Sequence, residues 1–213
     1  MKKSLNNYIT NIIFYSFILI PISLISGPLI SDVIISLIAI LFISYCLMNN
    51  EYKYFKNSFF FIFIFFYLWC LICALQSDYK LVSSLKSLVY FRFFIFALAI
   101  SYLLSNEINY KKYLYNILFL TLSFVVVDTY IQYFFGKDIF GYEKSFHRLS
   151  GPFGNELIVG SFIGKILPVL MSIYFYFNKK MSLGLIILVY LSFIITFLSG
   201  ERVSFFNITT FLL

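Results

Sequence analysis

Long apolar runs follow one another along almost the whole chain, and short polar connections separate them. Each run meets or approaches the roughly 20 apolar residues that a helix needs to cross a bilayer. Seven complete runs cover residues 12–26, 29–48, 59–75, 88–104, 113–135, 156–177 and 183–199, and an eighth begins at Val203. This pattern predicts an all-α integral membrane protein, a polytopic bundle of seven or eight transmembrane helices.

The composition agrees with this pattern. Hydrophobic residues make up 62% of the 213 residues and charged residues only 12%, and the mean hydropathy is +0.93. A soluble domain would carry about 25% charged residues. Because more apolar runs follow the first, a cleaved signal peptide is disfavoured. The spans use nearly the whole sequence, so we expect residues 1–213 to form a single transmembrane domain.

The lysines predict how the spans are oriented. Four pairs lie in alternate connections: Lys2 and Lys3, Lys53 and Lys56, Lys111 and Lys112, and Lys179 and Lys180. The other connections carry six cations against these eight: Lys80 and Lys86, three between Gly136 and Asn155, and Arg202. By the positive-inside rule the paired lysines mark the cytoplasm, and the N-terminus is cytoplasmic. The net charge of +7 is explained by lysines that orient the spans and need not bind nucleic acid. The expected partners are therefore membrane lipids, with no nucleic acid.

Only three of the sixteen cationic side chains are arginines, and this topology places all three at the outer face. They are Arg92, Arg148 and Arg202. A guanidinium is planar, always charged and suited to phosphate or pyrophosphate. These residues are therefore candidate ligands for a lipid-linked anionic substrate. The alternative is that they anchor helix ends at the membrane interface.

The longest connection, the outer loop 136–155, contrasts with its apolar neighbours. Gly141, Gly151 and Gly154, together with Pro152, predict a loop with a defined path. We expect Asn155 to cap the helix that follows, with Glu156 in its first turn. A polar loop of this length in so apolar a chain favours a functional role.

Two spans beside this loop carry unusual residues. Gly160 and Gly164 form a face that would let a neighbouring helix approach closely. Lys165 lies about 13 Å below the outer end of its span, and Asp128 lies about 10 Å below the outer end of the preceding span. We expect either an Asp128–Lys165 ion pair or two charges that each face a hydrated cavity.

Two further outer positions carry ionisable residues that could take part in a site. His147 is the only histidine of the chain, and it could serve as a general base near neutral pH or simply make loop contacts. Glu201 and Arg202 follow Gly200 in the last outer turn. That pair could belong to a site, or it could be a local ion pair that caps the next helix.

Several of these segments resemble the O-antigen ligase/polymerase family. The resemblance is carried by residues 128–138 (DTYIQYFFGKD), 148–156 (RLSGPFGNE), Gly160-Ser161 and 199–202 (SGER). It implies a GT-C-like, integral-membrane glycosyltransferase of the bacterial inner membrane. Such an enzyme moves a glycan from undecaprenyl pyrophosphate, on the periplasmic side, to lipid A-core or to another glycan.

The resemblance also implies roles for individual residues. Arg148 and Arg202 match the pyrophosphate ligands, and Arg92 is a weaker third candidate. Glu156 would orient Arg148 or support the loop. The pyrophosphate leaving group can be stabilised by arginines, so neither a metal nor another cofactor is expected.

The chain departs from the family in one respect, because it ends before the large outer loop that carries the family's catalytic histidine. The catalytic residue is therefore unknown, and the sequence is expected to be an N-terminal portion of such an enzyme. The competing interpretation is a transporter or flippase for an anionic or lipid-linked substrate, with Asp128 and Lys165 as pathway charges. A non-catalytic membrane scaffold is the third, and the polar loop argues against it.

Overall fold

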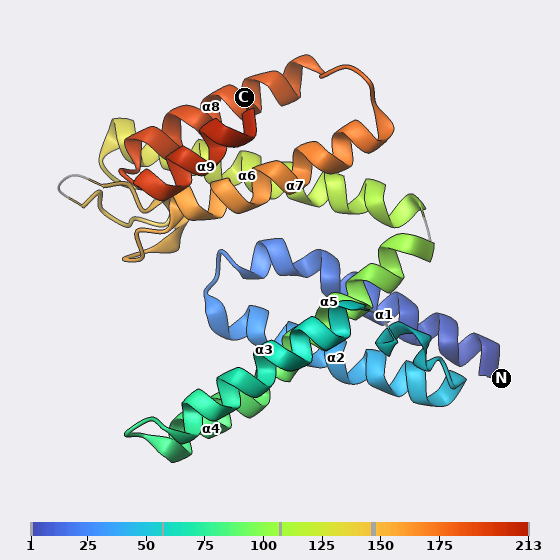
Figure 1. Ribbon diagram of the computed structural model, residues 1–213. Helices are drawn as coiled ribbons and strands as arrows, with labels where there is room; N and C mark the ends of the chain where they lie inside the picture. The colour runs from blue at the N-terminus through green and yellow to red at the C-terminus, as the bar shows by residue number, and fades with distance from the viewer. Residues whose placement is uncertain (1, 57, 107, 146–147, 213) are drawn as a thin grey trace. The chain divides into compact units, whose positions relative to one another are not determined.

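The computed structural model of the chain describes residues 2–56, 58–106, 108–145 and 148–212, and these residues are mostly helical (Figure 1). The helices are α1 (Lys2–Ser23), α2 (Pro28–Asn49), η1 (Tyr52–Phe55), α3 (Ser58–Leu75), α4 (Lys80–Val89), α5 (Phe91–Asn106), α6 (Ile108–Phe135), η2 (Gly151–Phe153), α7 (Val159–Phe177), α8 (Leu183–Leu198) and α9 (Arg202–Leu212). β-Structure within the described residues is limited to two isolated bridges in the loop after α6. The predicted all-α class is confirmed.

In the described part of the chain, four helical segments are long and apolar enough to cross a membrane, judged by length and composition. They are Pro28–Asn49, Lys80–Ser105, Asn109–Phe135 and Val159–Phe177. The apolar helix α8 is too short to be counted with them. Its 16 residues extend about 24 Å, whereas the hydrocarbon core is about 30 Å thick. Within the described residues, membrane-helix character therefore holds for four segments. The seven or eight spans and the GT-C-like arrangement stay a prediction.

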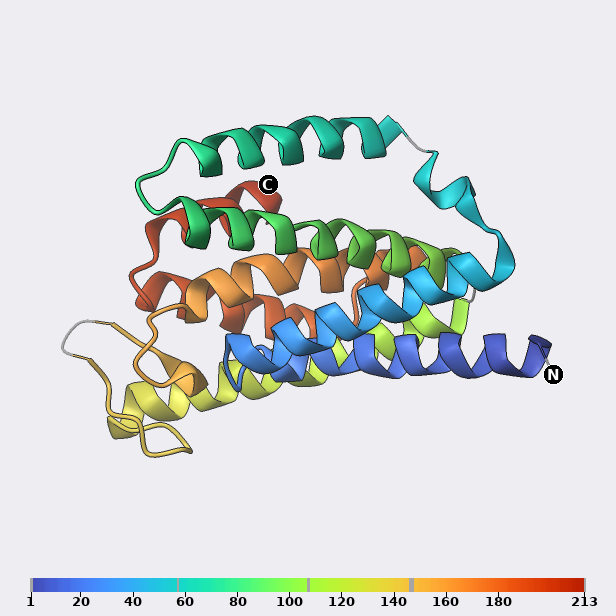
Figure 2. The same cartoon turned by 90° about the horizontal axis from the view of Figure 1, so that it is seen from below.

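One expected connection is a helix. Lys80 and Lys86 were assigned to a polar outer connection, yet they lie in α4, which continues almost directly into α5. The segment KLVSSLKSLV alternates polar and apolar residues at helical spacing, so its polar residues are compatible with a helix. α3 and α4 lie side by side in Figures 1 and 2, and the Tyr67 hydroxyl of α3 donates to the Leu88 carbonyl of α4.

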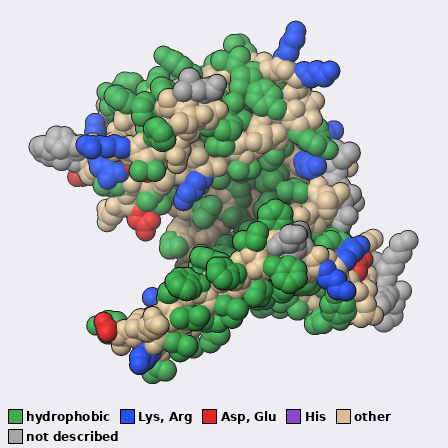
Figure 3. All heavy atoms as spheres, in the orientation of Figure 1, with side chains coloured by type: hydrophobic (Ala, Val, Ile, Leu, Met, Phe, Trp, Pro, Cys, Tyr) green, Lys and Arg blue, Asp and Glu red, His purple; other side chains and the backbone are tan. Residues whose placement is uncertain are grey.

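The chain forms two compact units, each described by itself. Unit 1 comprises Met1–Ile20 and Pro28–Tyr110, and unit 2 comprises Pro21–Gly27 and Lys111–Leu213. Hydrophobic side chains cover much of the visible face of each unit (Figure 3). Such a surface is typical of helices that contact lipid.

Unit 1 is organised around α2 and α5, which run parallel. At their first turns Asp32 of α2 pairs with Arg92 of α5, and further along Tyr45 of α2 contacts Tyr102 of α5. The core between them is apolar and contains the fully buried side chains of Ile38, Phe42, Ile95 and Leu103. Aromatic rings from α3 extend this core, and Phe63 stacks on Phe94 with ring centroids 4.4 Å apart.

Unit 2 contains α7 and α9 as parallel neighbours in close contact. Gly160 of α7 meets Glu201, and Gly164 of α7 meets the backbone of Ser204 in α9. A β-carbon at Gly164 would lie 3.6 Å from Cβ and 3.8 Å from Cα of Ser204. The predicted glycine face is thus confirmed, since it lets another helix approach at backbone distance.

This contact gives the first prediction. Gly164→Leu should lower the free energy of unfolding by about 1–3 kcal/mol, because the added side chain forces α7 and α9 apart. Gly184→Leu is the matched control, since a β-carbon at Gly184 of α8 meets nothing within 4 Å. Thermal unfolding in detergent, followed by circular dichroism, measures both. Equal melting temperatures for the two variants would contradict the packing of α7 on α9.

Candidate functional site

The loop 136–155 is held by polar side chains that α6 buries near its end. Asp128 is fully buried, and its carboxylate accepts the backbone N–H of Ile139 at 2.9 Å. Lys165, by contrast, has an exposed side chain on α7. No ion pair joins Asp128 to Lys165 in the part of the chain that the structure describes. The expected pair is replaced by a contact between α6 and its own loop. The burial of Asp128 also contradicts the alternative for this residue, because its carboxylate does not face a hydrated cavity.

Gln132, one turn beyond Asp128, fixes the far end of the loop. Its amide oxygen accepts the backbone N–H groups of Ser150 (3.0 Å) and Gly151 (2.9 Å). Its amide nitrogen donates to the Ser150 hydroxyl at 3.0 Å and to the Tyr142 carbonyl at 3.3 Å. Gln132 is fully buried, and its side chain satisfies the main-chain N–H groups of Ser150 and Gly151, which are buried as well.

The first half of the loop is a small hairpin. The Asp138 carboxylate accepts the N–H of Tyr142 at 2.6 Å, and the N–H of Lys144 donates to the Gly136 carbonyl at 2.8 Å. The exposed side chains of Lys137 and Glu143 form an ion pair at 2.9 Å. Hydrogen bonding and charge from Lys137 hold the pKa of Glu143 below its usual value.

The second half returns to the bundle through η2. Gly151 packs on the Thr129 hydroxyl of α6, and Gly154 lies under the ring of Tyr142. Both glycines have positive φ (+54° and +65°), as does Gly141, so the defined path that the glycines predicted is confirmed. Asn155 belongs to a turn, however, and α7 begins three residues after Glu156, at Val159. The expected Asn155 cap is therefore wrong, because η2 and its turn occupy that part of the loop.

Arg148 joins the loop to the Ser199–Arg202 turn. Its Nε donates to the carbonyl of Ser199 at 3.2 Å, across 51 residues of sequence, and its Nη2 donates to the carbonyl of Leu157 at 3.4 Å. The side chain lies against Gly200, where a β-carbon would be 3.7 Å from its Cγ. Glu156 is exposed and takes part in neither hydrogen bond. Arg148 is thus oriented by main-chain carbonyls.

Glu201 uses its carboxylate to cap α7. One oxygen accepts the N–H of Gly160 at 2.8 Å, and the other accepts the Ser204 hydroxyl at 3.2 Å. A carboxylate is favoured there because the first N–H groups of a helix are unpaired and carry partial positive charge. Gly160 permits the contact, since a β-carbon there would lie 2.6 Å from the Ser199 hydroxyl.

Arg202, the first residue of α9, is exposed. Within the described residues it forms no ion pair, so neither Glu201 nor another carboxylate neutralises it. The Ser199–Arg202 turn therefore carries one cation whose charge is open to solvent, with Arg148 packed beside the turn. An anion such as a phosphate is a ligand that the exposed guanidinium of Arg202 could hold.

Arg92 belongs to unit 1 and has its own partners. Its Nη2 pairs with Asp32 at 2.8 Å, and its Nη1 donates to the Ser36 hydroxyl at 2.9 Å. Sequence reasoning missed Asp32. The signal was present, because Asp32 is the one charged residue of the apolar run 29–48, and such a residue is expected to have a partner.

The remaining candidate, His147, lies outside the described residues. Among the residues that are described, no three His, Cys, Asp or Glu side chains gather in a way that could hold a metal ion.

The fold and the site together define, over the residues that the structure describes, an all-helical protein with four candidate membrane spans and an arginine-bearing turn that contacts a polar loop. Comparison with protein-family models, with curated proteins and with solved structures finds no match for this chain.

The loop anchor gives the second prediction. Gln132→Leu should expose the 136–155 loop to proteolysis and destabilise the protein, at a cost of about 1–3 kcal/mol for each buried group left unsatisfied. Gln76→Leu is the control, because Gln76 is an exposed glutamine after α3. Limited proteolysis with mapped cleavage sites measures the effect. A loop equally resistant in both variants would show that Gln132 does not hold it.

Proposed function

We propose that the chain is, or is part of, an O-antigen ligase/polymerase-like glycosyltransferase of the bacterial inner membrane, with seven or eight spans in a GT-C-like arrangement. It would take a glycan from undecaprenyl pyrophosphate at the periplasmic face and transfer it to lipid A-core or to another glycan. One observation carries the proposal. The loop that bears Arg148 folds onto the turn that bears Arg202, and both segments belong to the sequence resemblance.

The electrostatics of the turn support a pyrophosphate ligand. Glu201 is adjacent to Arg202 in sequence, but its two oxygens accept hydrogen bonds from Gly160 and Ser204. Among the described residues, no ion pair with Glu201 therefore occupies the donors of the Arg202 guanidinium. Arg202 also stands at the N-terminus of α9, where the helix dipole adds partial positive charge.

In the proposed reaction an acceptor hydroxyl attacks the anomeric carbon of the lipid-linked glycan. The bond between that carbon and the pyrophosphate oxygen breaks, and the pyrophosphate leaves with the electron pair. Arg202 and Arg148 would stabilise the charge that develops on the leaving group. The base that takes the proton of the acceptor is not assigned to a described residue. Arg92 would contribute only if Asp32 released it.

The competing proposal of a transporter or flippase requires Asp128 and Lys165 as charges along a pathway. Asp128 instead binds the backbone of its own loop and is fully buried. No contact of the described residues favours transport over transfer.

The third prediction tests the ligand. Arg202→Gln should weaken the binding of undecaprenyl pyrophosphate to the protein in nanodiscs by about tenfold, which corresponds to roughly 1.4 kcal/mol for one charged contact. Lys179→Gln, which removes an exposed cation from the connection between α7 and α8, should leave the affinity unchanged. Displacement of a labelled lipid measures both variants.

Arg148→Lys extends the test. A lysine cannot donate to both carbonyls in the geometry of a guanidinium, so this variant should lose affinity and also melt at a lower temperature. Arg202→Lys should lose affinity alone, because Arg202 is exposed. If Arg202→Gln and Lys179→Gln bind the lipid as tightly as the unaltered protein, the proposed pyrophosphate site is excluded.

A further inference from the structure

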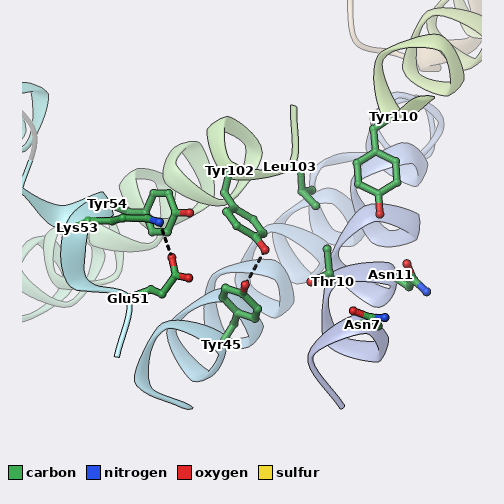
Figure 4. A pocket seen from close by; sticks show the side chains of 10 residues that line it. All are labelled: Asn7, Thr10, Asn11, Tyr45, Glu51, Lys53, Tyr54, Tyr102, Leu103 and Tyr110. Atoms are coloured by element: carbon green, nitrogen blue, oxygen red, sulfur yellow. Dashed lines mark hydrogen bonds and ion pairs between the residues drawn. The ribbon is translucent and has the colours of Figure 1, made fainter. Parts of the chain in front are cut away.

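Unit 1 contains a polar cavity of about 460 Å³ that the arginine-bearing turn does not involve. The first turns of α1, the end of α2, η1, the end of α5 and the start of α6 surround it (Figure 4). It lies near the other end of the α2–α5 pair from Arg92, since Asp32 and Tyr45 are about 20 Å apart along α2. Cavities of this size accommodate small ligands.

Two buried hydroxyl groups at the cavity leave one proton without an acceptor. Tyr45 and Tyr102 are both less than 10% exposed, and their hydroxyls lie 2.7 Å apart and point toward each other (Figure 4). Each hydroxyl carries one proton, and the hydrogen bond between them uses only one. Among the described residues, no acceptor receives the second proton of this tyrosine pair. An oxygen atom of a ligand in the cavity could accept that proton.

The charges at the cavity cancel. Among the described residues that line it, Glu51 and Lys53 are the charged ones, and their side chains pair at 3.1 Å. Hydrogen bonding to Glu51 raises the pKa of Lys53, which keeps the ammonium charged. The Lys53 ammonium also lies 5.1 Å from the centre of the Tyr54 ring, where a cationic ligand would bind. Since the pair disfavours both anions and cations, the cavity suits a neutral ligand.

The remaining wall offers amide groups. Asn7 and Asn11 lie one turn apart on α1, so they share a face, and both are exposed. An amide both donates and accepts, which matches a hydroxyl that does the same. The aromatic ring of Tyr54 adds a flat apolar surface to this lining.

We propose that this cavity binds a neutral saccharide of one or two rings, either as a free sugar or as the headgroup of a glycolipid. The free proton of the tyrosine pair donates to a sugar oxygen, Asn7 and Asn11 bind hydroxyls, and the apolar face of the ring lies against a tyrosine. The proposal is independent of the proposed transferase function, because the two sites share no residue.

The test is a titration of the full chain with methyl β-glucoside, observed by saturation-transfer NMR. The protein is kept in a polyoxyethylene detergent, because glucoside and maltoside detergents would occupy the site. Binding should be saturable, and Tyr45→Phe and Asn11→Ala should each weaken it by about fivefold through the loss of one hydrogen bond. Tyr8→Phe is the control, because Tyr8 is exposed on α1 and does not line the cavity.

Three outcomes would overturn the proposal. They are no saturable binding of methyl β-glucoside, equal binding by the Tyr45→Phe, Asn11→Ala and control variants, and saturable binding of inorganic phosphate or tetramethylammonium in place of the sugar. Asn11→Ala keeps the test valid if Tyr45→Phe fails to fold. Octyl β-glucoside, used below its micelle concentration, identifies the source of the ligand. Much tighter binding than that of methyl β-glucoside assigns the site to a glycolipid headgroup, and equal binding assigns it to a free sugar.

Discussion

The carboxylate of Glu201 caps the N-terminus of α7 from a different segment of the chain, at 2.8 Å from the N–H of Gly160. The contact requires the start of α7 to pack directly against the 199–202 turn. Only glycine fits at position 160, because a β-carbon there would lie 2.6 Å from the Ser199 hydroxyl. It sets the turn at the start of α7, next to Ser204 of α9. The carbonyl of Ser199, which receives Arg148, is positioned by the same turn.

Backbone groups that are buried away from water must find hydrogen-bond partners inside the protein. The loop 136–155 meets this requirement with Asp128 and Gln132 of α6, which are both fully buried. The side chains of Asp128 and Gln132 thus hold the loop in place. The loop in turn positions Arg148 against the Ser199–Arg202 turn. Polar residues in an apolar helix can thus have a structural role, because they bind the backbone of a neighbouring loop.

Patterns along the chain predicted the helical class, the defined path of the loop 136–155 and the glycine face of α7, while the pyrophosphate-binding roles of Arg148 and Arg202 stay predictions. They did not predict that Asp128 would bind Ile139 in place of Lys165, because depth along a helix says nothing about direction around it. The start of α7 was misjudged since turn residues and cap residues are the same types. Asp32 pairs with Arg92 across α2 and α5, and such a partnership depends on tertiary packing.

Hydrogen exchange at the backbone amide of Gly160 tests this account most directly. If the Glu201 carboxylate holds that N–H, exchange should be slow in the unaltered protein and about tenfold faster in Glu201→Ala, with amides near the middle of α7 unchanged. Fast exchange at Gly160 in the unaltered protein, or an unchanged rate in Glu201→Ala, would contradict the cap and the placement of the turn that depends on it.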